Sequence, residues 1–442
     1  MLNIASNIED QGWLKYIVKE FVRSTNAKFK VTFSRPDEDV EIKNCITYGF
    51  SQEHAVSIPH MGKIKKGEFD WKSNDFFILK NSEIKDSQYT FTYDLFWNAF
   101  FHISRIEEWE QEAEGKRILS YSKKHPRIDK KTFNYPIVNS YFEKLKSTLL
   151  VHFPELVFND PLPPVVEWSH DLDYITKSTQ LIIKQTIFNS FNTVKSIGKK
   201  SFLSNLKRTV SFLFSNPSYW CFDYWQAIEK KYQVTSTFFI YSKQQLNGGL
   251  FTSIRRWLID PSYNVLENAQ LQKKLIKLHF EGWDIGVHGS YDSANNEAVF
   301  NQELHSLSSV LRIEIKKSRQ HWLNFSESKT SKIHSKSIAR DYTIGWNDQV
   351  GFRAGIASSF VPFDHENNQP FNHLVIPQVI MDSHIFDYKI DQEKALDVFE
   401  KALDKENVNF SVSWHPRTCS SDYNWHFVYE SLLKKYQGYL SQ

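Results

Sequence analysis

The chain has 442 residues, and because ordinary domains span about 100–200 residues, its length favours two domains. The formal net charge is only +3 at pH 7, which excludes a global positive field and gives no support for a nucleic-acid partner. With 41% hydrophobic and 24% charged residues, the composition also excludes wholesale disorder. Aromatic residues make up 15% of the chain, and they can supply either core packing or sugar-stacking surfaces.

The three cysteines, Cys45, Cys221 and Cys419, are far apart and form no C-x-x-C pair. This spacing is typical of a reducing compartment and provides no disulfide framework. The N-terminal sequence has no basic segment followed by an apolar one, and no window approaches the roughly 18 apolar residues of a spanning helix. We therefore expect a cytoplasmic protein, with peripheral contact at the inner membrane face left open by a basic segment described below.

The first part of the chain alternates short strand-like runs with helical patterns, which predicts a smaller α/β domain over residues 1–160. One helix is expected over Phe96 to Glu114, where the acidic run EEWEQEAE would form a solvated face, and another over Val138 to Val151. Four prolines within the eleven residues 154–164 then mark the domain boundary, because proline lacks a backbone donor and stops helices. Nothing in these residues indicates the role of the domain.

From residue 161 to residue 442 the pattern changes to strands that alternate with helices. The strand-like runs are VVEWSH, TSTFFIY, WDIGVH, SRQHWL, YTIGW, VIPQVIM and FSVSWH. Such alternation predicts a mainly parallel sheet, and at this length a barrel is favoured over an open sheet. The expected fold class is therefore α/β, a distorted (β/α) barrel of about seven strands preceded by the smaller α/β domain.

One segment of the barrel region, residues 174–222, contains no acidic residue but carries seven basic residues among apolar ones. The simpler interpretation is a basic insertion that packs on the barrel with its cations in water. The alternative is an amphipathic segment that lies on an anionic membrane surface or binds an acidic ligand. The basic residues are Lys177, Lys184, Lys195, Lys199, Lys200, Lys207 and Arg208.

Two aspartates close the strand-like run WSHDLDY. Asp171 and Asp173 are two residues apart, so the alternation of a strand points both carboxylates the same way. At the carboxyl end of a barrel strand they would project into the mouth, where barrel enzymes place their active sites. Two adjacent carboxylates suit a division of labour in which one holds a metal and the other takes a proton.

Other strand ends carry histidine or arginine. WDIGVHGSYDS supplies His288, with Asp292 four residues later, and an imidazole beside carboxylates suits a divalent metal. Each of these positions taken alone could be structural, but their succession along the chain favours a metal-dependent hydrolase. The remaining strand ends supply Arg319 with His321, Arg353 in a glycine-flanked loop, and His415.

The order of these segments resembles the NodB-type polysaccharide deacetylases, carbohydrate esterase family 4. The segments that carry the resemblance are WSHDLDY, STFFIY, GWDIGVHGSYDS, SRQHWLNF, GFRAGIASSFVPFD, VIPQVIMD and SVSWHP. More narrowly, the chain resembles the subgroup from bacterial surface-polysaccharide loci that carries its own N-terminal domain. DLFWNAFFHISRIEEW and YPIVNSYFEKL resemble that domain.

The resemblance implies a role for each matching position. Asp171 would be the catalytic base, oriented by Arg353, and His415 the general acid, tuned by Asp382. Asp173 and His288 would hold a divalent metal, zinc in the first place, with manganese and cobalt as alternatives. For substrate binding we consider Trp414 and Tyr291, and Trp168 and Trp322 are the other tryptophans near proposed site positions.

The second motif departs from the usual H-x-x-x-H of the family, because Asp292 stands where the second histidine is expected. Three interpretations remain open: Asp292 supplies an oxygen ligand, His321 enters the site from the next strand, or the metal is held weakly. In the last case the chain would be a non-catalytic glycan-binding or scaffold descendant of the deacetylase fold.

The expected function is a metal-dependent N-deacetylase that acts on an N-acetylated sugar within a glycan or glycan precursor. A close alternative is a deformylase or deacetylase of a lipid-linked sugar at the cytoplasmic membrane face, and the basic segment 174–222 would suit such a substrate. The non-catalytic descendant is the alternative from a different class.

Overall fold

The computed structural model describes residues 1–9, 11–36, 43–62, 67–72, 76–80, 83–84, 88–198, 200–243 and 249–440. The larger of its sheets has eight strands in the order β14-β11-β10-β9-β8-β7-β16-β15, which are parallel and curl into a half-barrel. This confirms the predicted α/β class and the distorted barrel. The strands are β7 (Val165–Leu172), β8 (Ser236–Ile240), β9 (Asp284–Gly289), β10 (Lys317–Gln320), β11 (Arg340–Asp341), β14 (Leu374–Val375), β15 (Gln378–Met381) and β16 (Asn409–Ser413).

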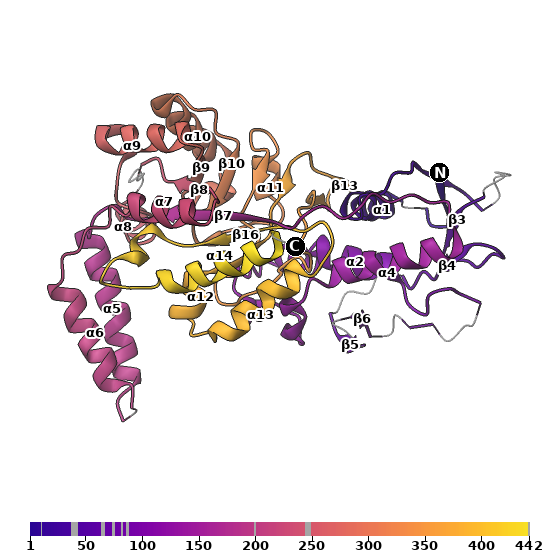
Figure 1. The fold of residues 1–442 in the computed structure, drawn as a ribbon, viewed down its shortest axis with the longest axis horizontal. Helices are drawn as coiled ribbons and strands as arrows, with labels where there is room; N and C mark the ends of the chain where they lie inside the picture. Colours follow the sequence, from indigo (N-terminus) through magenta and orange to yellow (C-terminus); the bar gives the residue numbers. More distant parts are fainter. Residues whose placement is uncertain are drawn as a thin grey trace. The chain divides into compact units, whose positions relative to one another are not determined.

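The smaller α/β part at the N-terminus is built on a four-stranded sheet with the order β2-β1-β3-β4. All three strand pairs are parallel. Such a sheet needs helical connections and cover, which α1 (Gly12–Ser24), α2 (Leu95–Ile103) and α4 (Ile137–His152) supply beside it (Figure 1). The strands are β1 (Leu2–Ser6), β2 (Val31–Ser34), β3 (Cys45–Tyr48) and β4 (Val56–Ile58).

The chain divides into two compact units that are not consecutive stretches of sequence. Unit 1 comprises Met1–Val166 with Phe325–Ser411, and unit 2 comprises Glu167–Asn324 with Val412–Ser441. The consecutive domains expected at 1–160 and 161–442 stay a prediction.

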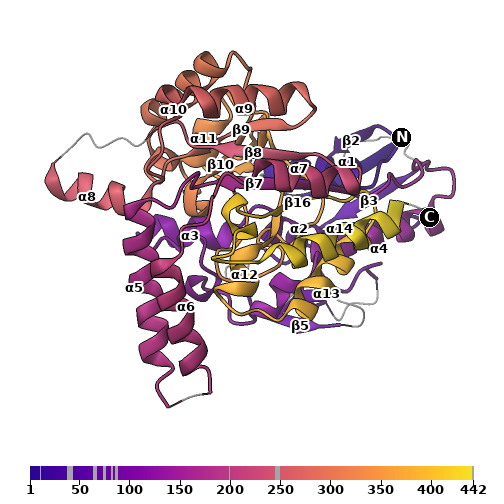
Figure 2. The same cartoon turned by 60° about the vertical axis from the view of Figure 1, so that its left-hand side comes forward.

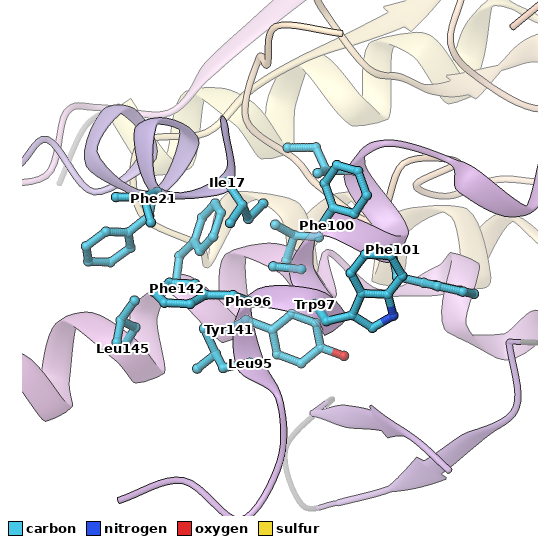
Figure 3. Close-up of a cluster of buried hydrophobic side chains, with 14 of the residues drawn as sticks. Ile17, Phe21, Leu95, Phe96, Trp97, Phe100, Phe101, Tyr141, Phe142 and Leu145 are labelled. Carbon is cyan, nitrogen blue, oxygen red and sulfur yellow. The ribbon is translucent and has the colours of Figure 1, made fainter. Parts of the chain in front are cut away.

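Unit 1 uses many of the aromatic residues as core. Trp13, Trp97 and Phe100 pack with ring centroids 5.1–5.3 Å apart, and α2 places further rings against α1 and α4 (Figure 3). In this unit the aromatic excess therefore serves packing. Its other elements are β5 (Phe69–Trp71), β6 (Phe77–Leu79), α3 (Ile106–Ala113), α11 (Thr330–His334), β12 (Phe363–Asp364), β13 (Gln369–Pro370), α12 (Asp382–Phe386) and α13 (Gln392–Leu403).

The helix expected over Phe96 to Glu114 is broken in two, because Arg105 adopts a left-handed conformation with φ 53° between α2 and α3. The expectation of a solvated acidic face is wrong for Glu107 and Glu108, which are buried. Glu107 accepts hydrogen bonds from Arg127, and Glu108 accepts them from an arginine 245 residues away. A local pattern cannot reveal such distant partners, and a buried carboxylate needs them.

Unit 2 contains the central parallel strands β7 to β10, with β8 pairing with β7 and β9, and β9 with β10. The carboxyl ends of these strands lie at one edge, which positions the site described below (Figure 1). Within the described ranges no helix is both long and apolar enough to cross a membrane. The helices of this unit are α5 (Thr179–Lys195), α6 (Phe202–Phe214), α7 (Phe222–Lys231), α8 (Leu250–Ile259), α9 (Ala269–Phe280), α10 (Glu297–Leu311) and α14 (His426–Leu440).

Candidate metal centre and catalytic site

Three buried side chains of unit 2 converge on one point. Asp173 follows the end of β7, His288 lies in β9, and His321 follows the end of β10. One ligand atom from each lies within 4.8 Å of the other two. Asp173 Oδ1 is 3.5 Å from His288 Nε2 and 3.6 Å from His321 Nε2. One carboxylate and two imidazoles are ligands that suit a divalent transition metal.

The carboxylate oxygen at the centre of this group has no protein donor. Asp173 Oδ1 is buried and, among the described residues, has no hydrogen-bond partner. An unpaired buried acceptor is costly unless something satisfies it. A cation between Asp173 and the two histidines would do so, and the residues therefore fit a divalent metal ion.

The far nitrogens of both histidines are held by acceptors. His288 Nδ1 lies 2.9 Å from the Arg319 carbonyl oxygen, and His321 Nδ1 lies 3.2 Å from Asp260 Oδ1. A carbonyl and a carboxylate can only accept, so these partners assign the proton to Nδ1 in each ring. The lone pair of each Nε2 then faces Asp173, which is the arrangement that orients histidine ligands in metal sites.

The second oxygen of Asp173 faces a histidine and an arginine. Asp173 Oδ2 is 3.4 Å from His415 Nε2 and accepts a hydrogen bond from Arg417 Nη1 at 2.9 Å. Burial alone would raise the pKa of Asp173, but His415, His288, Arg417 and His321 together hold the pKa well below its usual value. The carboxylate is therefore ionised at neutral pH, as a metal ligand must be.

Asp171, the other carboxylate of the pair, is hydrogen-bonded to a different arginine. Its Oδ1 accepts a hydrogen bond from Arg319 Nη1 at 2.6 Å, and the fully buried Arg319 also donates to Ser413 Oγ at 2.9 Å. Burial raises the pKa of Asp171, but Arg319, His288 and His415 more than offset this and leave the pKa below its usual value. The two aspartates thus have different arginine partners, Arg319 for Asp171 and Arg417 for Asp173, while His288 and His415 act on both.

Arg353, expected to orient Asp171, is committed elsewhere in unit 1. Its Nε and Nη2 donate to the Glu108 carboxylate at 3.1 and 2.6 Å, and its Nη1 donates to Ser120 Oγ at 2.6 Å. Arg319 takes the predicted position beside Asp171. The order of residues in the sequence does not say which of two arginines reaches a given carboxylate.

Asp382 is also in unit 1, buried at the start of α12, where its Oδ1 accepts the Ser383 N–H at 2.7 Å. Its predicted role as the partner that tunes His415 stays a prediction. His415 itself follows β16 in unit 2 and is half-buried, with its Nε2 toward Asp173.

Asp292 lies outside the converging group. Arg255 Nη2 and Arg256 Nε, both from α8, contact its two oxygens at 2.5 and 2.9 Å. Of the alternatives left open by the sequence, the structure brings His321 and not Asp292 to Asp173 and His288. The two arginines hold the Asp292 carboxylate by charge-assisted hydrogen bonds from α8.

The tryptophans considered for substrate binding differ in how deeply they are buried. Trp414, expected to bind substrate, is fully buried and its indole N–H donates to the Trp425 carbonyl, so it offers no face to a sugar; Trp168 is likewise core. Trp322 is 45% exposed beside His321 and has a left-handed backbone with φ 58°. A bulky residue held in this region is uncommon and occurs at functional sites.

Tyr291 is half-buried near His321. Its backbone N–H donates to Asp260 Oδ1 at 2.9 Å, the same oxygen that faces His321 Nδ1. Its ring lies under Arg255, whose guanidinium carbon is 5.8 Å from the ring centroid. Tyr291 therefore helps to position the histidine's partner, and its predicted contact with substrate stays a prediction.

Sequence reasoning missed two supporting residues and the role of a third. Asp260 lies at the end of α8, in the segment IDP, and Arg417 follows His415 by two residues. Arg319 was noticed only as a strand-end residue. The one available signal was proximity in sequence to a candidate ligand, which holds for Arg319 and Arg417 but not for Asp260.

Comparisons with known proteins give one family match and several solved structures at low identity. Residues 3–154 match a family of unknown function, DUF7033. A candidate polysaccharide deacetylase from Mycobacterium smegmatis is 10% identical with a TM-score of 0.36, over 63% of this chain and 85% of that chain. A carbohydrate esterase family 4 pseudoenzyme from Bacillus anthracis is 11% identical with a TM-score of 0.29, over 63% of this chain and 62% of that one. The search of curated proteins returned no match.

Proposed function

We propose that this protein is a metal-dependent hydrolase that removes an N-acyl group, acetyl in the first place, from an amino sugar in a polysaccharide or its precursor. One observation carries the proposal: Asp173 faces two imidazoles whose lone pairs point at it, while Asp171 nearby is paired with Arg319. This is the division between metal ligand and proton acceptor that amide hydrolysis requires. The resemblance of the sequence motifs to NodB-type deacetylases supports the same reaction.

Each residue of the site would contribute one step. Asp173, His288 and His321 would hold the metal, zinc or alternatively manganese or cobalt, which when bound polarises a carbonyl and acidifies water. Asp171, kept ionised by Arg319, accepts the proton of the attacking water. His415 then donates a proton to the departing amine, because an amine leaves poorly as an anion.

The substrate class follows from the same resemblance and from one exposed ring. Trp322, adjacent to His321, can stack against the apolar face of a sugar. An N-acetylated glycan is the first candidate, and a lipid-linked N-formyl or N-acetyl sugar is the second. A cytoplasmic setting at the inner membrane face belongs to the second form of the proposal.

Release of acetate or formate from a panel of N-acylated sugars, with and without chelator, tests the reaction. Asp171→Asn should lower turnover by about 10²–10⁴-fold, because that is what a positioned base contributes, and should keep the metal. Asp292→Asn is the matched control, since this aspartate is bound by Arg255 and Arg256. Turnover in the Asp171 variant equal to that of the wild type would exclude the mechanism.

A second candidate is a non-catalytic glycan-binding descendant, and Arg417 favours it. Its guanidinium already donates to Asp173 Oδ2 at 2.9 Å, so a protein cation neutralises part of the charge a metal would bind. Metal analysis of the dialysed protein separates the two candidates. A hydrolase should retain a stoichiometric divalent metal, whereas metal-free protein that still binds the N-acylated glycan would establish the binding module.

A further inference from the structure

Helices α5 and α6 form a hairpin that extends away from the strands of unit 2, and the two helices lie side by side in both views (Figures 1 and 2). It contains most of the basic segment 174–222, of which Lys199 lies outside the described residues. Leu181 and Phe212 anchor its base in a small buried cluster with Tyr174 and Tyr219.

The contact between the two helices is polar. Thr193 Oγ1 of α5 and Thr209 Oγ1 of α6 lie 3.1 Å apart and are buried. Within α5, Gln185 donates a hydrogen bond to the buried Asn189 at 3.0 Å. Hydroxyl pairs between helices are typical of helices that associate in lipid, where the surroundings are as apolar as leucine.

The outward faces of the same helices are apolar. Residue spacings of three, four and seven put the exposed side chains on one stripe of each helix. Phe214 is 86% exposed and Leu203 is 74% exposed. A protein surface in water rarely carries such a contiguous apolar area unless something covers it. The stripes comprise Ile183, Ile187, Phe188, Phe191 and Val194 on α5, and Leu203, Leu206, Val210, Leu213 and Phe214 on α6.

The charge of the hairpin identifies what would cover it. No acidic residue occurs between Asp173 and Asp223, so every charged side chain of the segment is a cation. Two of them belong to the base of the hairpin, because Lys177 is buried against Asp422 and Lys184 donates to the Tyr174 hydroxyl at 2.9 Å. Among the described residues, the exposed cations are Lys195, Lys200 and Lys207. Lys195 lies over the Phe191 ring, 4.4 Å from its centroid, with its stem along the apolar stripe. Lysine and arginine side chains that flank apolar residues in this way place their charged ends at phosphate headgroups, while the apolar residues enter the acyl region.

The length of the helices limits how deep they can go. α5 has 17 residues and would be about 25 Å long at 1.5 Å per residue, which is less than the roughly 30 Å of a bilayer core. The hairpin can therefore lie in one leaflet but not span the membrane.

We propose that the α5–α6 hairpin docks on an anionic lipid bilayer, with its apolar stripes at the acyl boundary and its cations on the headgroups. The base of the hairpin adjoins the candidate site, since Tyr174 follows Asp173 and lies under the Arg417 guanidinium, 5.2 Å from the ring centroid. A bilayer bound there would present headgroup-linked sugars to the site. The docking goes beyond the hydrolase proposal and does not depend on it.

Flotation of the full chain with vesicles of phosphatidylethanolamine and phosphatidylglycerol tests the docking, against vesicles of phosphatidylcholine alone. The wild type should float with the anionic vesicles. A variant with Phe191→Ser, Leu206→Ser and Phe214→Ser should have a vesicle partition coefficient at least about a hundredfold lower. The reason is that each of these exposed apolar side chains contributes to the free energy of membrane binding when it is buried. Lys195→Gln should cost about fivefold on anionic vesicles only.

Phe280→Ser is the matched control, because Phe280 is 84% exposed but lies at the end of α9, outside the hairpin. It should float as the wild type does. Failure of the wild type to float, or equal flotation of the triple variant, would overturn the proposal. A dimer in solution that the triple variant abolishes, without flotation, would assign the stripes to a second copy of the chain. Acetate release from a soluble substrate should be unchanged in the triple variant, so the two proposals fail separately.

Discussion

Both units bury an Asp–His–His group, and the two groups differ in where their nitrogen and oxygen atoms point. In unit 2 the ligand atoms of Asp173, His288 and His321 converge within 4.8 Å. In unit 1, His334 Nδ1 is 3.1 Å from Asp341 Oδ2, but the His373 ring lies 6.3 Å from that of His334 between centroids. Across the described residues only the first group converges as a metal site would. Proximity of the right residue types is therefore not sufficient, and lone pairs must meet at one point.

The buried arginine–carboxylate pairs differ in the same way. In unit 1, Glu108 is chelated by two nitrogens of Arg353, and Glu327 by two nitrogens of Arg105 at 3.0 and 2.8 Å. In unit 2, Asp171 receives a single nitrogen of Arg319 and has two histidines near it. A fork-to-fork pair is saturated and holds structure, whereas a single contact leaves a carboxylate able to accept a proton.

The largest effect expected from this comparison is on unit 1. Arg353→Met leaves the buried Glu108 carboxylate without its partner, so the free energy of unfolding should fall by about 3–5 kcal/mol in urea denaturation. Lys332→Met is the matched control, because its pair with Glu366 is exposed and should be worth less than about 1 kcal/mol. A loss below that value for Arg353 would mean that the pair is not structural.

The sequence predicted the site residues at the ends of the strands better than it predicted the partners that surround them. Asp171, Asp173, His288 and His415 were placed together because the carboxyl ends of parallel strands meet at one edge. The contribution of His321 depends on the backbone of the next two residues, which are both left-handed, and no local pattern indicated that turn.

Partners distant in sequence were the part that could not be predicted. Arg417 reaches Asp173 from 244 residues away, and Arg319 reaches Asp171 from 148. Asp292 carried the correct spacing for a ligand but was bound by arginines of α8. The inclusion of Phe325–Ser411 in unit 1 likewise has no local signal, because it is set by tertiary packing.

A metal-binding pair of variants tests the comparison of the two Asp–His–His groups directly. Asp173→Asn should lower the affinity for zinc by more than about a hundredfold, since even loss of a residue that hydrogen-bonds to a metal ligand costs about 10–100-fold. Asp341→Asn, the same change in unit 1, should leave the affinity unaltered because its neighbours do not converge. Competition with a chelating dye measures both. Loss of zinc in the Asp341 variant alone would reverse the assignment.

His288 of unit 2 and His384 of unit 1 have pKa values that are shifted in opposite directions. Burial lowers the pKa of His288, but Asp173 and Asp171 more than offset it and leave the pKa raised. In unit 1, burial lowers the pKa of His384 to about 4. Its Nδ1 accepts the Met381 N–H at 3.1 Å and its Nε2 lies 2.8 Å from the Trp346 carbonyl, so the neutral ring is fully used.

Of the three predictions, the one for neutral His384 has the smallest expected effect. The sign of its pH dependence is defined. The unfolded chain takes up a proton near pH 6.5, whereas the folded chain resists until about pH 4, so the stability due to neutral His384 is present above pH 6.5 and declines as the pH falls. Between pH 7 and pH 5 the free energy of unfolding should fall by about 2 kcal/mol on this account.

In His384→Gln, urea denaturation should show that part of the fall missing, because glutamine binds no proton. His54→Gln, the same change at an exposed histidine, leaves His384 in place and should keep the full fall. An unchanged pH dependence in the His384 variant would place the acid sensitivity of unit 1 on its other buried histidines.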